Sequence, residues 1–163
     1  MALLTPAQAL VLKADIEADG VLNALPKNSD GAIAVAIAYN LLAVPDFTVW
    51  KTSVPIVEVG QNIDGSELAN KTTGDNTRLQ TIIQLSGGFI NPSLADQRMF
   101  FDDVFSGAGG NITRPKLLAL WKRLSTRLEK VFAIGTGSDA SPATMVIEGS
   151  IGANEIQAVR NLP

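Results

Sequence analysis

The sequence predicts a mainly α-helical protein: a helical bundle with one β-hairpin-like excursion and an extended C-terminal arm. Three observations predict it. Capping and stop residues delimit successive helical stretches, β-forming residues concentrate between positions 47 and 59, and a Gly/Ser/Ala-rich stretch follows position 134. The length of 163 residues is that of about one domain. We therefore expect the bundle over residues 1–134, with the excursion at about 47–76, and the arm with a short terminal helix over 135–163.

The first helix is predicted to begin after Thr5 and to end at Gly20. Thr5 is a favourable N-cap, Pro6 suits the first helical position, and Gln8 completes a capping box. Apolar residues then recur near helical spacing up to the glycine that stops the helix.

A second, Ala-rich helix is predicted from a cap at Asn28–Asp30 to about Val44, after which a proline ends it. The β-forming stretch runs from Phe47 to Val59, and Pro55 within it indicates an edge or bulged strand. Residues 61–76 are polar and contain turn signals, so we expect them to form the tip or return of the excursion.

Three more helices are predicted, at about 76–86, from Asn91-Pro92 to Phe105, and from Thr113 to a stop at Gly135. The last of these carries one apolar stripe, made of Leu117, Leu120, Trp121, Leu124, Leu128 and Val131. A short strand at 144–147 and a short helix at about 154–160 complete the prediction.

The composition excludes many enzyme classes, because the chain contains neither cysteine nor histidine. No thiolate nucleophile, Ser–His dyad, disulfide or Cys/His metal site is available. Composition alone does not exclude a site based on carboxylates, a metal bound by oxygen ligands, or a phosphate-binding loop. None of the loose motifs supports them, so we expect no enzyme activity, no catalytic residues, no cofactor and no metal.

Two motifs fail on their context. Residues Gly135–Ala140 fit G-x-G-x-x-A, but that dinucleotide fingerprint needs a strand before it and a helix after it, so we interpret the segment as a flexible linker. Asn62–Gly65 resembles the middle of an EF-hand loop, but Gly60 and Lys71 occupy the positions where the loop requires acids.

Two acidic pairs also have simple interpretations. Asp15 and Asp19 share one face of the first predicted helix, where solvation at the surface is the default interpretation. Asp102 and Asp103 are adjacent and diverge by about 100° on a helix, so they do not form a facing carboxylate pair.

The predicted helix that begins at Thr113 is the one charged feature above background. Six of the 13 basic residues and a single glutamate lie there, which gives a net charge of +5 locally against −8 for the rest of the chain and −3 overall. The residues predicted to share a face opposite the apolar stripe, and hence to form a contact surface, are Lys116, Arg123, Arg127 and Lys130. A solvated helix face is the plain alternative; an acidic protein or a phosphate backbone is the functional one.

The sequence resembles a family encoded by tailed phages and prophages, and the similarity extends in order over most of the chain. The matching segments are KADIEAD (13–19), NSDGAIAVAIAYN (28–40), VWKTSV (49–54), DDVFSG (102–107) and TGSDASPATMVIEG (136–149). The predicted element order is similar to that of head-to-tail connector adaptors. Those proteins form rings, typically of about twelve copies, beneath the portal.

The resemblance implies a structural virion protein at the head–tail junction, made in the host cytoplasm. Its expected partners are other copies in a ring, the portal protein, and a tail terminator or tail completion protein, with transient contact to passing genomic DNA. A tail terminator or other neck protein is the nearest alternative role, and a DNA-binding or packaging accessory protein is the alternative from another class. We expect segments 59–76 and 135–151 to carry contacts between subunits.

No membrane association is expected. The N-terminal segment Met1–Leu12 has no basic region ahead of an apolar run, so it does not predict a signal peptide. The longest apolar stretch, Ala32–Val44, is shorter than the roughly 20 residues that span a bilayer, and a soluble protein is expected.

Overall fold

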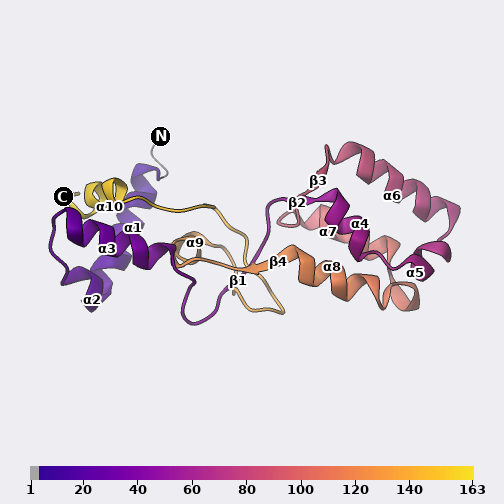
Figure 1. Cartoon of the computed structure of the whole chain (residues 1–163), viewed down its shortest axis with the longest axis horizontal. Helices are drawn as coiled ribbons and strands as arrows, with labels where there is room; N and C mark the ends of the chain where they lie inside the picture. The colour runs from indigo at the N-terminus through magenta and orange to yellow at the C-terminus, as the bar shows by residue number, and fades with distance from the viewer. Residues whose placement is uncertain (1–3) are drawn as a thin grey trace. The chain divides into compact units, whose positions relative to one another are not determined.

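The computed structural model describes residues 4–163, which form two compact units (Figure 1). Unit 1 combines the residues up to Val49 with Leu124–Pro163, and unit 2 is the continuous segment Trp50–Arg123. The described residues are 57% helical, with ten α-helices and two small two-stranded sheets. The predicted mainly α fold class is therefore confirmed.

The two units divide the chain differently from the predicted division after residue 134. The segment 135–163 belongs to unit 1, and unit 2 is inserted between its two parts. Within the described residues, no helix combines the length and apolar character that a membrane crossing requires.

Unit 1 contains both ends of the chain. Its helices are α1 (Pro6–Ala18), α2 (Gly20–Asn23), α3 (Ser29–Asn40), α9 (Arg127–Phe132) and α10 (Ala153–Arg160). The predicted capping box of α1 is confirmed: the Gln8 backbone N–H donates to Thr5 Oγ1 over 3.3 Å, and the Thr5 N–H donates to Gln8 Oε1 over 2.8 Å. Helix α10 packs on α3 and α1 (Figure 1), so the two ends of the chain close one core.

The core of unit 1 draws on all five helices and on the C-terminal arm. Its fully or nearly buried members include Leu12, Ile16, Ala32, Val35, Tyr39, Leu128, Ile147, Ile151, Ile156 and Val159. Along the arm, Ala143, Met145 and Ile147 are buried in alternation, which is the pattern of an extended segment packed on one side. The predicted strand at 144–147 is reduced to isolated bridges, Val49 to Ala143 and Ile134 to Thr144. The arm is therefore extended, as predicted, but is packed into unit 1.

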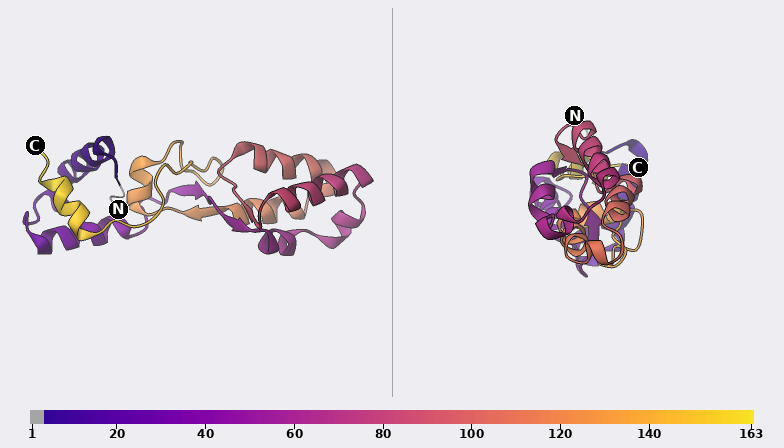
Figure 2. Two further views of the ribbon diagram at one scale, coloured as in Figure 1. Left: turned by 90° about the horizontal axis from the view of Figure 1, so that it is seen from above. Right: turned by 90° about the vertical axis from the view of Figure 1, so that its right-hand side faces the viewer.

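Unit 2 is largely helical. Its elements are β2 (Val54–Pro55), α4 (Ile56–Asn62), α5 (Gly65–Ala69), α6 (Thr73–Leu85), β3 (Phe89–Ile90), α7 (Ala95–Val104), the 3₁₀ helix η1 (Gly107–Gly110) and α8 (Thr113–Trp121). Strand β2 pairs with β3 in antiparallel register, with Val54 opposite Ile90. Helices α6 and α7 pack together, as do α4 and α8 (Figure 2). The core of this unit includes Val54, Val59, Leu79, Ile90, Phe101, Val104, Phe105, Leu117 and Trp121.

The predicted β excursion at 47–76 is wrong over most of its length, because residues 56–62, 65–69 and those from 73 onward are helical. The two turn signals in this stretch, Asp64-Gly65 and Thr73-Gly74, lie at the starts of helices α5 and α6, which are capped by Asp64 and Thr72. Asp64 Oδ1 accepts from the N–H groups of Ser66 and Glu67, and Thr72 Oγ1 accepts from the N–H of Asp75.

The chain passes between the units at two strands, β1 (Thr48–Trp50) and β4 (Lys122–Leu124), which pair with each other. Strand β4 interrupts the helix predicted from Thr113 to Gly135, so that prediction of one continuous helix is wrong. Helix α8 ends at Trp121, and α9 begins at Arg127 behind a new capping box formed by Thr126 and Glu129.

Candidate functional site

The four residues predicted to form one basic contact surface lie on three different elements. Lys116 is exposed on α8 and Arg123 is half-buried in β4, both in unit 2. Arg127 and Lys130 are half-buried on α9 in unit 1. Because the expected helix is broken, its single basic face does not form. Whether any of these residues contacts a partner stays a prediction.

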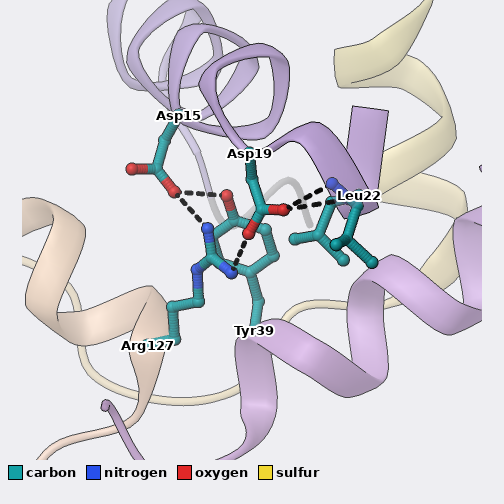
Figure 3. Close-up of polar contacts among 6 residues, drawn as sticks. Asp15, Asp19, Leu22, Tyr39 and Arg127 are labelled. Atoms are coloured by element: carbon teal, nitrogen blue, oxygen red, sulfur yellow. Dashed lines mark hydrogen bonds and ion pairs between the residues drawn. The ribbon is translucent and has the colours of Figure 1, made fainter. Parts of the chain in front are cut away.

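Arg127 joins three helices of unit 1 that are far apart in the sequence (Figure 3). Its Nη1 donates to Asp19 Oδ2 over 2.7 Å, and its Nη2 donates to Asp15 Oδ2 over 3.1 Å. The guanidinium also lies over the Tyr39 ring, 4.7 Å from its centroid. The Tyr39 hydroxyl donates to the same Asp15 oxygen over 2.5 Å. We call Asp15, Asp19, Tyr39 and Arg127 the clamp.

Local sequence explains how the clamp is positioned. Asp15 and Asp19 are four residues apart, so both carboxylates extend from one side of α1. Asp19 also caps α2, because its Oδ1 accepts from the N–H groups of Val21 and Leu22 over 3.0 and 3.1 Å. The acidic pair that the sequence leaves as a solvated face is therefore bound to a cation from the predicted basic surface.

Within the clamp, the pKa values of Asp19, Tyr39 and Arg127 are all shifted away from neutral pH. The hydrogen bond from Arg127 lowers the pKa of Asp19, with help from the backbone N–H groups of Leu22 and Val21. Burial, and then the hydrogen bond to Asp15, raise the pKa of Tyr39. Burial alone would lower the pKa of Arg127, but its bonds to Asp19 and Asp15 raise it on balance. A group that exchanges protons in catalysis needs a pKa near the working pH, so the clamp is suited to holding structure.

A groove of about 590 Å³ opens beside the clamp in unit 1. Six of its lining residues are aliphatic and four are charged. The lining residues are Asp15, Asp19, Ala38, Leu41, Leu42, Ala43, Val44, Arg127, Lys130 and Val131. The Lys130 ammonium lies 5.6 Å from the centroid of the Phe47 ring. An aliphatic wall with a few charged groups suits a protein side chain or helix better than a small polar substrate.

Unit 2 holds its own charged groups in long-range contacts. The Glu67 carboxylate is buried and accepts from the N–H groups of Ile112 over 2.8 Å and of Thr113 over 2.9 Å. Thr113 Oγ1 in turn accepts from the Asp64 N–H over 3.0 Å. Burial would raise the pKa of Glu67, but the hydrogen bonds from Thr113 and Ile112 lower it on balance. Glu67 thereby joins α5 to the start of α8.

The other charged residues noted in the sequence also have structural contacts. Asp102 accepts from Arg114 Nε over 3.0 Å at the surface of unit 2. Arg98 lies over the Trp50 ring, 4.2 Å from its centroid. Within residues 4–163, no three His, Cys, Asp or Glu side chains are grouped so that they could hold a metal ion.

The glycine motif at 135–140 has a packing explanation. It lies between α9 and an irregular stretch, without the strand and helix that a dinucleotide site requires. Gly137 has a φ of +67°, and a Cβ at this position would lie 2.1 Å from a Phe47 ring carbon. This glycine therefore allows the arm to pass directly over Phe47.

Sequence reasoning missed three residues that organise the units: Tyr39, Glu67 and Glu129. The signal for Glu129 is present, because Thr126-x-x-Glu129 is a capping-box pattern and indicates a helix start at Arg127. The bonds of Glu67 to Ile112 and Thr113, 45 and 46 residues away, leave no local signal.

Comparisons of the chain with protein-family models, curated proteins and solved structures give no significant match.

Proposed function

We propose that this chain is a structural protein of a tailed-phage virion and forms the head-to-tail adaptor ring that joins portal to tail. The sequence resemblance described above supports this proposal. Its partners would be other copies of itself, the portal, and a tail terminator or tail completion protein.

The observation that carries the proposal is the number of large apolar side chains left exposed in both units. In unit 1 they include Leu10, Val11, Val21, Ile33, Ile37, Leu41, Leu42, Val44 and Ile134, and in unit 2 Val57, Ile83, Leu85, Phe89, Leu94 and Met99. Isolated exposed apolar residues are ordinary, but neighbouring ones mark protein contacts. Ile33, Ile37 and Leu41 follow one another along a single helix face. Such a surface is expected of a subunit that functions by assembly.

The charged groups agree with a binding role. Asp15, Asp19 and Arg127 are bound to one another, and Glu67 binds backbone N–H groups. These contacts stabilise the two units.

The mainly α fold favours the adaptor over the tail terminator. A terminator built around an inner sheet would be predominantly β, whereas the described residues contain only two small sheets. A DNA-binding role has less support. Lys116 and Lys130 lie in different units, and the charge of Arg127 is offset by two carboxylates.

Binding to portal-bearing heads tests the proposal. Purified chain would be mixed with tailless phage heads, and the bound fraction measured by sedimentation, with portal-free capsids as the control. We expect saturable binding to portal-bearing heads at about twelve copies per head. Equal binding to both particles, or binding to neither, would contradict the adaptor role.

A charge-reversal variant distinguishes the adaptor role from the DNA-binding alternative. The double variant Lys116→Glu, Lys130→Glu leaves the clamp intact. If the adaptor role holds, the wild-type chain shows no salt-sensitive DNA binding for this variant to lose. Loss of such binding in the variant, with portal binding unchanged, would favour the accessory-protein alternative.

A further inference from the structure

Helix α3 is apolar on nearly all sides, yet only one side is buried. Between Asp30 and Asn40 it contains no charged residue, and Tyr39 supplies the only polar side chain. One side packs into the core through Ala32, Val35, Ala36 and Tyr39. On the opposite side Ile33, Ile37 and Leu41 are 45%, 58% and 61% exposed. A helix that is apolar all round is normally buried all round, so this side needs a partner.

The exposed side continues beyond the end of the helix. Leu42 and Val44 are 57% and 91% exposed, and with Ala38 and Leu41 they form the aliphatic wall of the groove. We call Ile33, Ile37, Leu41, Leu42 and Val44 the α3 face. All five residues lie within one segment, 33–44, and three of them, Leu41, Leu42 and Val44, also line the groove.

The α3 face has one charge at each end. Asp30 lies in the first turn, on the same side of the helix as Ile33 and Ile37. Lys130 lines the groove at the other end, where its ammonium lies 5.6 Å from the centroid of the Phe47 ring. Among residues 4–163, neither Asp30 nor Lys130 forms an ion pair.

The shape of the face is self-complementary. Ile33, Ile37 and Leu41 form a row of bulky side chains, and Ala34 and Ala38 form a parallel row of small ones beside it. Two such helices related by a two-fold axis can place the bulky row of each into the shallow row of the other.

We propose that a second copy of this chain binds the α3 face, with the two α3 helices antiparallel and Asp30 of each copy facing Lys130 of the other. Asp30 precedes Ile37, the midpoint of the bulky row, by seven residues, which is about 10 Å of helix. In an antiparallel pair the second copy's Asp30 therefore lies about 10 Å beyond the midpoint, beside Leu41–Val44 and the groove that contains Lys130. Opposite charges then meet at both ends of an apolar contact.

This inference goes beyond the adaptor role and does not depend on it. A two-fold contact uses the same surface on both copies, whereas the repeating contact of a larger ring joins two different surfaces. We propose the pair as a state of the free protein. It is tested on the purified chain alone, and portal binding tests the adaptor role separately.

Oligomeric state across a concentration series is the test, measured by light scattering and sedimentation up to about 100 μM. The wild-type chain should form dimers in this range. Ile37→Lys should weaken dimerisation at least about tenfold, because it places a charge at the centre of the contact. Leu85→Lys is the matched control, because it also places a lysine at an exposed aliphatic position. Leu85 is the last residue of α6 in unit 2, so this change should leave dimerisation unchanged.

A charge swap tests the antiparallel arrangement. Asp30→Lys and Lys130→Asp should each weaken the dimer, and the double variant should restore it. Circular dichroism and thermal midpoints show whether each variant is folded, and the double variant carries both single changes, so recovery cannot come from better folding. A wild-type chain that stays monomeric, or a double variant that stays as weak as the single ones, would overturn the proposal. A monomer in which Ile37→Lys abolishes portal binding would overturn it too, and would assign the face to the portal.

Discussion

Each unit buries a glutamate near the start of a helix, but the two glutamates differ in how far along the sequence their hydrogen-bond donors lie. In unit 1, Glu129 is 2% exposed and accepts from the Thr126 N–H, three residues earlier, and from the Gly149 N–H of the arm. In unit 2, Glu67 is 7% exposed and accepts from the N–H groups of Ile112 and Thr113, about 45 residues away. Unit 1 is assembled from both chain ends and adds the clamp between side chains, whereas unit 2 is continuous and joins α5 to α8 through carboxylate-to-backbone bonds. The mode of stabilisation thus follows how each unit is assembled from the chain.

The largest expected change in unfolding free energy comes from a core substitution in unit 2, which tests whether the two units are stabilised separately. Phe101 is buried in the core of unit 2 and packs edge-on against Trp121 at 5.5 Å between ring centroids. Phe101→Ala should destabilise unit 2 by about 3–5 kcal/mol. Hydrogen exchange read by mass spectrometry should then rise in α4–α8 and stay unchanged in α1, α3 and α10. Equal loss of protection in both units would mean that the chain is one cooperative unit.

A smaller effect is expected from removing the cation of the clamp. Arg127→Met leaves the carboxylates of Asp15 and Asp19 without their shared partner, so unit 1 should lose about 1–2 kcal/mol, a figure reduced because these groups are partly exposed. The neighbouring change Lys130→Met on the same helix is the control and should cost less than about 0.5 kcal/mol. Denaturant titrations of the two variants measure the difference. Equal losses would show that the clamp contributes nothing specific.

In unit 2 the matching change is Glu67→Gln. The amide keeps the shape of the side chain but offers one acceptor oxygen to two N–H groups, so it should lower the thermal midpoint of this unit by a few degrees. Glu58→Gln, at an exposed position in the first turn of α4, should leave the midpoint nearly unchanged. An unchanged midpoint for Glu67→Gln would show that α5 and α8 do not depend on this contact.

The smallest effect is a pH dependence of unit 1. The folded pKa of Asp19 lies below the ordinary value of about 3.9. Its ionised form therefore stabilises the folded state above about pH 4, and this stabilisation is lost as the pH falls through the lower folded value. Unfolding free energies of unit 1 between pH 6 and about pH 2.5 should fall, and should fall less steeply in Arg127→Met. Identical slopes would remove the clamp as the source of the acid sensitivity.

Local signals in the sequence predicted part of this structure. The Thr5–Gln8 capping box, the Asn28 cap and the terminal helix are determined by neighbouring residues, and each is found close to its predicted position. The helix predicted from Thr113 to Gly135 shows where local periodicity fails. The Thr113–Gly135 stripe fits one helix by periodicity, but the cap at Thr126 and the pairing of β4 with β1 divide it.

The candidate site was less accessible to sequence reasoning. Asp15 and Arg127 each stand out in the sequence, but their contact joins residues 112 positions apart, and no spacing rule connects them. The α3 face could not be predicted from the sequence for a related reason. An Ala- and Ile-rich helix predicts burial, and only the packing of α1 and α10 on one side shows which residues stay exposed.

The most direct test of the proposed function is electron cryomicroscopy of the phage particles that contain this chain. The account predicts density for a ring of mainly helical subunits between portal and tail, into which the helices of unit 1 and unit 2 can each be fitted. Particles in which the chain is missing, or in which it occupies only positions away from the head–tail junction, would contradict the adaptor role.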